Sequence, residues 1–147
     1  MSQEYVVRLE CKLDDKNAIL PTRARTTDAG YDLYTITEHT LNPQETYRFE
    51  TGLRIAAPNG WYYTIEGRSS LWTQGIVPFR GIIDGGYTGL VSVRLMNLST
   101  VPYSIKKYDR IAQLVLHRVC HADIIVVEEF SPEYNCRGTA GFGSSGR

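Results

Sequence analysis

Seven runs of β-forming residues, separated by turn signals, constrain the fold of this chain more than any other feature. The runs are rich in Val, Ile, Tyr and Thr, and several alternate apolar with polar residues, as strands with one buried face do. Turn signals such as Asn42-Pro43 and Pro58-Asn59-Gly60 lie between them. The predicted strands are residues 4–13, 31–36, 47–57, 61–67, 89–98, 110–119 and 123–130. Short strands at this spacing indicate an all-β sandwich or barrel.

The same pattern predicts one domain. Only residues 69–75 read as a helical turn, with a serine capping the N-terminus of that turn. No repeat or linker divides the chain, so we expect a β domain over residues 1–136 and a flexible C-terminal arm over residues 137–147.

Charge and cysteine content exclude several classes of function. The chain has 16 basic and 16 acidic residues, so no net field draws it to nucleic acid or to an acidic membrane. No apolar run approaches the roughly 18 residues of a membrane span, and the polar start does not resemble a signal peptide. Three widely spaced cysteines form neither a disulfide framework nor a metal pair. We therefore expect an intracellular protein, cytoplasmic or nuclear, with no nucleic-acid or membrane partner.

The C-terminal arm has the composition of a phosphate-binding segment. Residues 137–146 read RGTAGFGSSG, with one guanidinium, three hydroxyl side chains, one aromatic ring and four glycines. Glycine-rich backbone exposes N–H groups, and arginine and serine donate to phosphate oxygens. A disordered terminus has the same composition, so the arm has a binding role only if it closes over a ligand.

Four other segments carry side chains suited to nucleotide chemistry. Residues 28–34 place two carboxylates around a turn, and residues 67–71 place Arg68 and two serines where a strand gives way to a helical start. Residues 81–89 put Asp84 and Tyr87 on a glycine-rich hairpin, and Gln113 interrupts an apolar strand. Each segment also has an ordinary structural interpretation as a capped turn, a hairpin or a strand.

Taken in order, the five segments resemble the motifs of the trimeric dUTPases. They read DAGYDLY at 28, GRSSL at 67, GIIDGGYTG at 81, RIAQL at 110 and RGTAGFGSSG at 137. The resemblance spans nearly the whole chain. It implies a distorted β jelly-roll, a homotrimer with active sites shared between subunits, and Mg²⁺-dependent hydrolysis of dUTP to dUMP and pyrophosphate. That reaction limits uracil incorporation into DNA and supplies dUMP.

The resemblance also implies roles for individual residues. Asp84 matches the general base that activates water for attack on the α-phosphorus, and Tyr87 matches the ring that lies under the deoxyribose and excludes a 2′-hydroxyl. Asp32 matches the group that holds Mg²⁺ through water. The remaining matches are to contacts with phosphate, the attacking water or the base: Arg68, Ser69, Ser70, Gly81, Gln113, Arg137, Phe142, Gly143, Ser144 and Ser145.

Several residues depart from the family pattern. Gly67 replaces the usual proline, Gly85, Gly86 and Thr88 replace acidic and arginine residues, and Ala140 replaces a glycine of the arm. Residues 77–81 read VPFRG where the family has a polar or small residue that reaches uracil. The base is therefore expected to be read by backbone near Gly81.

Three alternatives belong to other classes of protein. A dCTP deaminase has a similar second motif but needs a catalytic glutamate where this chain has Arg94, which cannot shuttle a proton. A regulatory, protein-binding relative of the dUTPase fold would not need the catalytic set, although it could retain it beside a second role. A structural jelly-roll protein would not need the arm.

Overall fold

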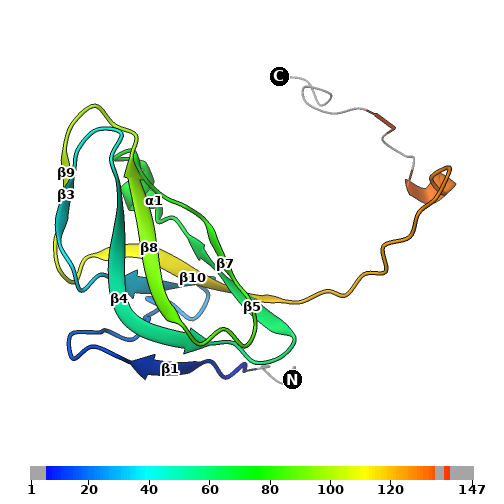
Figure 1. The fold of residues 1–147 in the computed structure, drawn as a ribbon, viewed down its shortest axis with the longest axis horizontal. Coiled ribbons are helices and arrows are strands. Elements are labelled where there is room, and N and C mark those ends of the chain that lie inside the picture. The colour runs from blue at the N-terminus through cyan, green and yellow to red at the C-terminus, as the bar shows by residue number, and fades with distance from the viewer. Residues whose placement is uncertain (1–5, 135–137, 140–147) are drawn as a thin grey trace.

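Two antiparallel four-stranded sheets form most of the computed structural model, which describes residues 6–134 and 138–139 (Figure 1). The first sheet has the order β1 (Glu10–Leu13), β4 (Thr46–Ala56), β8 (Leu90–Asn97) and β6 (Ile76–Pro78). The second has the order β2 (Gly30–Tyr34), β10 (Arg110–Arg118), β5 (Trp61–Glu66) and β7 (Gly81–Ile83). A two-stranded ribbon pairs β3 (His39–Leu41) with β9 (Tyr103–Ile105). Two short helical segments, α1 (Ser69–Trp72) and the 3₁₀ turn Pro132–Tyr134, complete the described elements.

The two large sheets enclose one apolar core. Alternate residues of β4 and β8, among them Phe49, Leu53 and Leu95, point inward and are fully buried. They meet Leu33, Tyr63, Ile65, Ile111 and Leu114 from the second sheet in the same cluster. The buried hydroxyl of Tyr63 donates to the carbonyl of Ile55 at 3.0 Å, which joins β5 to β4 across the sandwich. Burial raises the pKa of Tyr63 far above its ordinary value, so this hydroxyl stays a donor.

The predicted all-β sandwich is confirmed, with changes in its details. Strands β3, β6, β7 and β9 are only three residues long and lie outside the predicted runs, because so short a segment carries too few side chains to show an alternation. Helix α1 lies where the helical turn was predicted, but the predicted serine cap is wrong. Arg68 occupies the N-cap position and makes no side-chain cap hydrogen bond.

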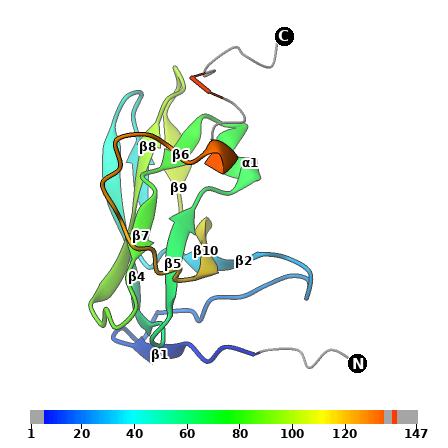
Figure 2. The ribbon, with the colours of Figure 1, turned by 90° about the vertical axis from the view of Figure 1, so that its right-hand side faces the viewer.

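The segment after β10 runs away from the body of the domain in Figure 1, and it lies in front of the domain in Figure 2, which is viewed from that side. Residues 123–130 were predicted as a strand, and that prediction is wrong for the described chain, which forms no strand there. Its apolar side chains are instead exposed, Ile124 at 98% and Phe130 at 79%. A strand needs a hydrogen-bonded neighbour, and this segment extends beyond the reach of its own sheets.

Within the described residues, no helix has both the length and the apolar character needed to cross a membrane.

Candidate active site

The register of the second sheet brings three sequence motifs together. Asp32 on β2 lies opposite Gln113 on β10, and Gln113 lies opposite Glu66 on β5. Arg68 follows the end of β5 by two residues and therefore emerges beside this row. Asp32 and Gln113 are more than 80 positions apart in the sequence, and strand pairing alone makes them neighbours.

Arg68 and Asp32 form a half-buried ion pair at the centre of this cluster. Arg68 Nε donates to Asp32 Oδ1 at 2.9 Å, and the two side chains are 21% and 19% exposed. The Nη1 atom of Arg68 also donates to the carbonyl oxygen of Arg110 at 3.1 Å. Arg110 Nη1 lies 3.4 Å from Asp32 Oδ2, so each carboxylate oxygen of Asp32 faces one arginine. The carboxylate thus fixes the directions of both guanidinium groups.

A hydrogen bond to a backbone carbonyl fixes the side chain of Gln113. Its Nε2 donates to the carbonyl of Gly67 at 2.7 Å. The side chain lies directly over Gly30, where a Cβ atom would be 2.0 Å from Gln113 Oε1. Glycine at position 30 is therefore the residue that leaves room for Gln113 in this orientation.

These residues line an open cavity of about 360 Å³. Two arginines, two serine hydroxyls and the amide of Gln113 supply donors, and Asp28 and Asp32 supply carboxylates. The complete lining is Ala24, Asp28, Ala29, Gly30, Asp32, Arg68, Ser69, Ser70, Arg110 and Gln113. This donor set suits an anionic ligand such as a phosphate chain.

Arg110 is the member of this cavity that sequence reasoning missed. It opens the RIAQL segment, so its place in that motif was the available signal. The register between β10 and β2 shifts between Arg110 and Ala112. Such an irregularity re-aims a side chain next to a site, which accounts for the contact between Arg110 and Asp32.

Asp84 and Tyr87 lie on a tight turn between β7 and β8. The amide of Tyr87 donates to the carbonyl of Asp84 at 3.2 Å, and Gly86 has a φ of +83°. A positive φ at this third position favours glycine. At Gly85, a Cβ atom would lie 2.6 Å from the carbonyl oxygen of Trp61. The two glycines that depart from the family pattern are thus the residues that this turn requires.

The ring of Tyr87 folds back over the end of the turn. Its hydroxyl donates to the carbonyl of Leu90 at 3.3 Å, and a Cβ at Gly89 would lie 2.1 Å from that hydroxyl. Tyr87 remains 47% exposed beside a cavity of about 220 Å³. That cavity is lined by Ile65, Ile82, Ile83, Asp84, Tyr87, Leu90, Val91 and Ser92.

The unusual VPFRG segment does not enter this cavity. Arg80 forms an ion pair with Glu66, Nε to Oε1 at 2.8 Å, and Phe79 is 53% exposed. Gly81 lies in β7 next to Ile83 and Ile65 and is likewise absent from the lining. The base-reading role of Gly81 stays a prediction.

One chain therefore divides the predicted site residues between two places. The cavity of Arg68 and Gln113 shares no residue with the cavity of Asp84 and Tyr87. The third group of predicted residues, Arg137, Phe142, Gly143, Ser144 and Ser145, lies outside the described residues, as does Ala140.

The carboxylates of Asp28 and Asp32 suit a magnesium ion only if the ion keeps its coordinated water molecules. Among the residues that the structure describes, no three His, Cys, Asp or Glu side chains are grouped to hold a metal. Both oxygens of Asp32 already face arginines, and Asp28 Oδ2 accepts from the amide of Arg25. Magnesium commonly binds through one or two carboxylates, several waters and substrate phosphates. The donor set fits that mode and does not fit a cage of protein ligands.

Gly67, which replaces the family's proline, has a local reason. A Cβ atom at this position would lie 2.3 Å from Nε1 of Trp72 and 3.2 Å from Cδ of Pro78. The indole of Trp72 thus covers the backbone directly before Arg68. Glycine and tryptophan at these two positions fit each other.

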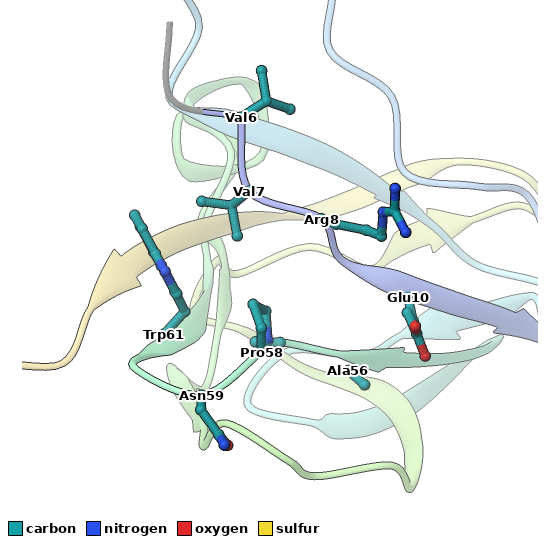
Figure 3. Close-up of a pocket in the computed structure, with 9 residues that line it drawn as sticks. Val6, Val7, Arg8, Glu10, Ala56, Pro58, Asn59 and Trp61 are labelled. Carbon is teal, nitrogen blue, oxygen red and sulfur yellow. The ribbon is translucent and has the colours of Figure 1, made fainter. Parts of the chain in front are cut away.

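A further hollow lies away from all of these residues, beside the first strand (Figure 3). It has a volume of about 430 Å³ and lies between the segment from Val6 to Glu10 and the β4–β5 corner. Val7 and Trp61 lie at one end and Glu10 at the other (Figure 3). None of the predicted site residues lines it.

Fold and cavities together define a class: jelly-roll-like β-sandwich proteins with an arginine- and serine-lined pocket for an anion. The family model described as dUTPase matches residues 16–146. A deoxyuridine 5'-triphosphate nucleotidohydrolase of Debaryomyces hansenii is 38% identical over 99% of this chain and 92% of the relative. A probable deoxyuridine 5'-triphosphate nucleotidohydrolase of Schizosaccharomyces pombe is 42% identical over 92% of this chain and 95% of the relative.

Solved structures give the same result. A dUTPase of Staphylococcus bacteriophage 80alpha with dUpNHpp superposes with a TM-score of 0.87 at 30% identity, covering 95% of this chain and 99% of that one. A dUTPase from phage phi11 of S. aureus, described with a structural Mg(II) ion, has a TM-score of 0.77 at 27% identity, covering 84% and 98%. The chain belongs to the dUTPase family.

Proposed function

We propose that this protein hydrolyses dUTP to dUMP and pyrophosphate. The observation that carries the proposal is the pocket in which Asp32 fixes Arg68 and Arg110 beside Gln113, in a chain of the dUTPase family. The names of the relatives and the dUpNHpp bound to the phage enzyme support the same substrate.

Asp84 is the general base in this proposal. Its carboxylate takes a proton from water as the water oxygen forms a bond to the α-phosphorus. The bond from the α-phosphorus to the bridging oxygen breaks, and pyrophosphate leaves with the electron pair. Asp84 is exposed on its turn and lines two cavities, so water reaches it in the single chain.

The basic pocket binds the triphosphate. Arg68 is already oriented by Asp32, which lowers the ordering cost of forming charge-assisted hydrogen bonds to phosphate oxygens. Ser69 and Ser70 add hydroxyl donors at the start of α1. Gln113 contacts the phosphates or the attacking water from its position over Gly30.

Tyr87 selects the sugar. Its ring is held against Gly89 and Leu90 and lines the cavity beside Asp84. A 2′-hydroxyl would collide with a ring under the sugar, so ribonucleotides are rejected by shape.

We further propose Mg²⁺ as the cofactor, with Asp32 contacting it through coordinated water. When bound to the triphosphate, the ion neutralises phosphate charge and orients the chain for in-line attack. Asp32 and Asp28 would hold its waters, as the exposed rim of the pocket allows.

The active form in this proposal is a homotrimer with shared sites. Two observations support it: the phosphate-binding and sugar-binding residues line separate cavities, and the apolar side chains of residues 123–130 lie exposed outside the domain. Ile124, Ile125 and Val126 form a contiguous exposed apolar stretch, and in this proposal a neighbouring copy buries them. The arm, residues 137–147, closes over the nucleotide, with Arg137, Ser144 and Ser145 on the γ-phosphate and Phe142 on uracil.

Free thiols at Cys11 and Cys120 agree with a reducing, intracellular compartment.

The first test is pyrophosphate release from dUTP, with dCTP, dTTP and UTP in parallel, with and without Mg²⁺. Release from dUTP alone and only with Mg²⁺ is expected. No release from any nucleotide would contradict the proposal and favour a regulatory relative of the fold. Release of ammonia from dCTP would indicate a deaminase, although Arg94 is exposed on β8 and absent from the lining of the Asp84 cavity.

A further inference from the structure

The sugar-binding turn is attached to the β4–β5 corner at several points. The amide of Gly86 donates to the carbonyl of Ala57 at 3.1 Å, and Gly85 packs against the carbonyl of Trp61. A third attachment comes from a side chain: Arg54 Nη1 donates to the carbonyl of Thr88 at 3.2 Å. Only this third attachment can be removed by changing a side chain without moving the backbone.

Arg54 is itself held in place from β1. Its Nε forms an ion pair with Asp14, whose amide is fixed by the carbonyl of Gly52 at 2.9 Å. The hydrogen bond from Arg54 holds the pKa of Asp14 below its ordinary value, so the carboxylate stays charged at neutral pH. The guanidinium is therefore fixed at one edge by Asp14 and directs its other edge at the turn.

The carbonyl that Arg54 binds belongs to the peptide on which the Tyr87 ring depends. The Thr88 carbonyl is part of the peptide unit that leads into Gly89, and Tyr87 lies over Gly89 at a distance that admits no Cβ. Rotation of this peptide would move Gly89, against which the ring lies. Leu90, whose carbonyl accepts the Tyr87 hydroxyl, stays paired with the Arg54 backbone in the β4–β8 ladder. The Arg54 side chain is thus linked to Tyr87 through the Thr88–Gly89 peptide.

We propose that Arg54 is a positioning residue for sugar selection, which acts by fixing the Thr88 peptide and through it the ring of Tyr87. The inference rests on the proposed function, because it concerns discrimination between dUTP and UTP. Arg54 itself touches neither the nucleotide nor the water. Its loss lowers selectivity more than turnover, because Asp84 keeps its place through the Gly85 and Gly86 contacts.

The test compares Arg54→Met and Arg54→Lys with the matched control Arg48→Met. Arg48 lies on the same strand, is 63% exposed and pairs only locally with Glu50, at 2.9 Å. The measured quantity is kcat/KM for dUTP divided by kcat/KM for UTP. Because Arg54 is 37% exposed and acts through a backbone contact, the energy of this hydrogen bond sets an upper bound, and the ratio should fall by up to about tenfold for Arg54→Met. Arg54→Lys should recover part of it and Arg48→Met should keep the full ratio.

Hydrogen exchange of residues 84–90 gives a readout that does not depend on activity. The amide of Tyr87 is hydrogen-bonded to the carbonyl of Asp84, so its exchange should accelerate in Arg54→Met and not in Arg48→Met, whereas the amide of Gly86 should keep its bond to Ala57 in both variants. An unchanged ratio or unchanged exchange in Arg54→Met would overturn the inference. An inactive wild-type protein would instead overturn the proposed function, and exchange would still decide whether Arg54 holds the turn.

Discussion

Replacing Gly30 by alanine should displace Gln113 without touching Arg68, Ser69 or Ser70. The new Cβ would lie 2.0 Å from Oε1 and 2.7 Å from Cδ of Gln113, far inside contact distance. Because Gly30 has no positive φ, the substitution adds no backbone strain, and the side chain of Gln113 must rotate. Rotation breaks the 2.7 Å hydrogen bond to Gly67. That bond is worth about 1 kcal/mol, and an imposed off-rotamer conformation adds about 1 kcal/mol.

The sum, about 2 kcal/mol, predicts a fall of roughly 30-fold in kcat/KM for dUTP. Steady-state pyrophosphate release measures it, and thermal unfolding shows whether the fold survives. A double-mutant cycle with Gln113→Ala identifies the cause, because alanine at 113 removes the atoms in closest conflict. In that background Gly30→Ala should cost about threefold or less. Wild-type kinetics in Gly30→Ala, or an equal loss in both backgrounds, would refute the reasoning.

Four other predictions follow from single contacts. Asp84→Asn should bind nucleotide normally but lose turnover by orders of magnitude, measured by calorimetry and single-turnover kinetics; comparable turnover would remove Asp84 from its role. Tyr87→Ala should let UTP compete with dUTP, and unchanged competition would count against the sugar filter. Tyr63→Phe should lower the free energy of unfolding by about 1 kcal/mol in urea, because it removes the buried hydrogen bond to the carbonyl of Ile55; no change would show that this bond does not stabilise the fold. A hydrogen bond from Arg54 lowers the pKa of Asp14 below its ordinary value of 3.8, and one from the amide of Asn42 lowers the pKa of Glu45 below its ordinary value of 4.5. Each charged carboxylate therefore stabilises the fold above its ordinary pKa, and this stabilisation is lost as pH falls through the folded pKa. Unfolding measured from pH 6 to about pH 2 should therefore be less acid-sensitive in Asp14→Asn with Glu45→Gln than in the wild type.

The residues of the phosphate pocket could be named from the sequence through the resemblance of their motifs to those of the dUTPases, and strand pairing is what brings three of them together. Asp32, Arg68 and Gln113 lie in or next to long strands, and once those strands pair in register the side chains meet. The contacts within the pocket could not be predicted. That Asp32 faces two arginines depends on a local register shift in β10, which no alternation of residue types reveals.

The steric reason for a glycine at position 85 could not be predicted from the sequence either. Gly85 appears there as a departure from a family pattern, whereas the structure shows a carbonyl that leaves no space for a Cβ. For residues 123–130 the sequence pattern is that of a strand, but the described chain forms none there. A strand needs a hydrogen-bonded neighbour, which the chain does not supply to this segment. Pattern predicts what a segment prefers, and pairing decides what it forms.

The contact between Trp72 and Gly67 couples substitutions at these two positions. Introducing the family's usual proline at position 67 would drive ring atoms into the indole, so the exposed ring of Trp72 must move for that substitution to fit. Replacing Trp72 by a small residue first would open the space and make the proline acceptable. Positions 67 and 72 are therefore coupled, and a library that varies both together samples combinations at the turn before Arg68 that a library varying only one of them leaves out.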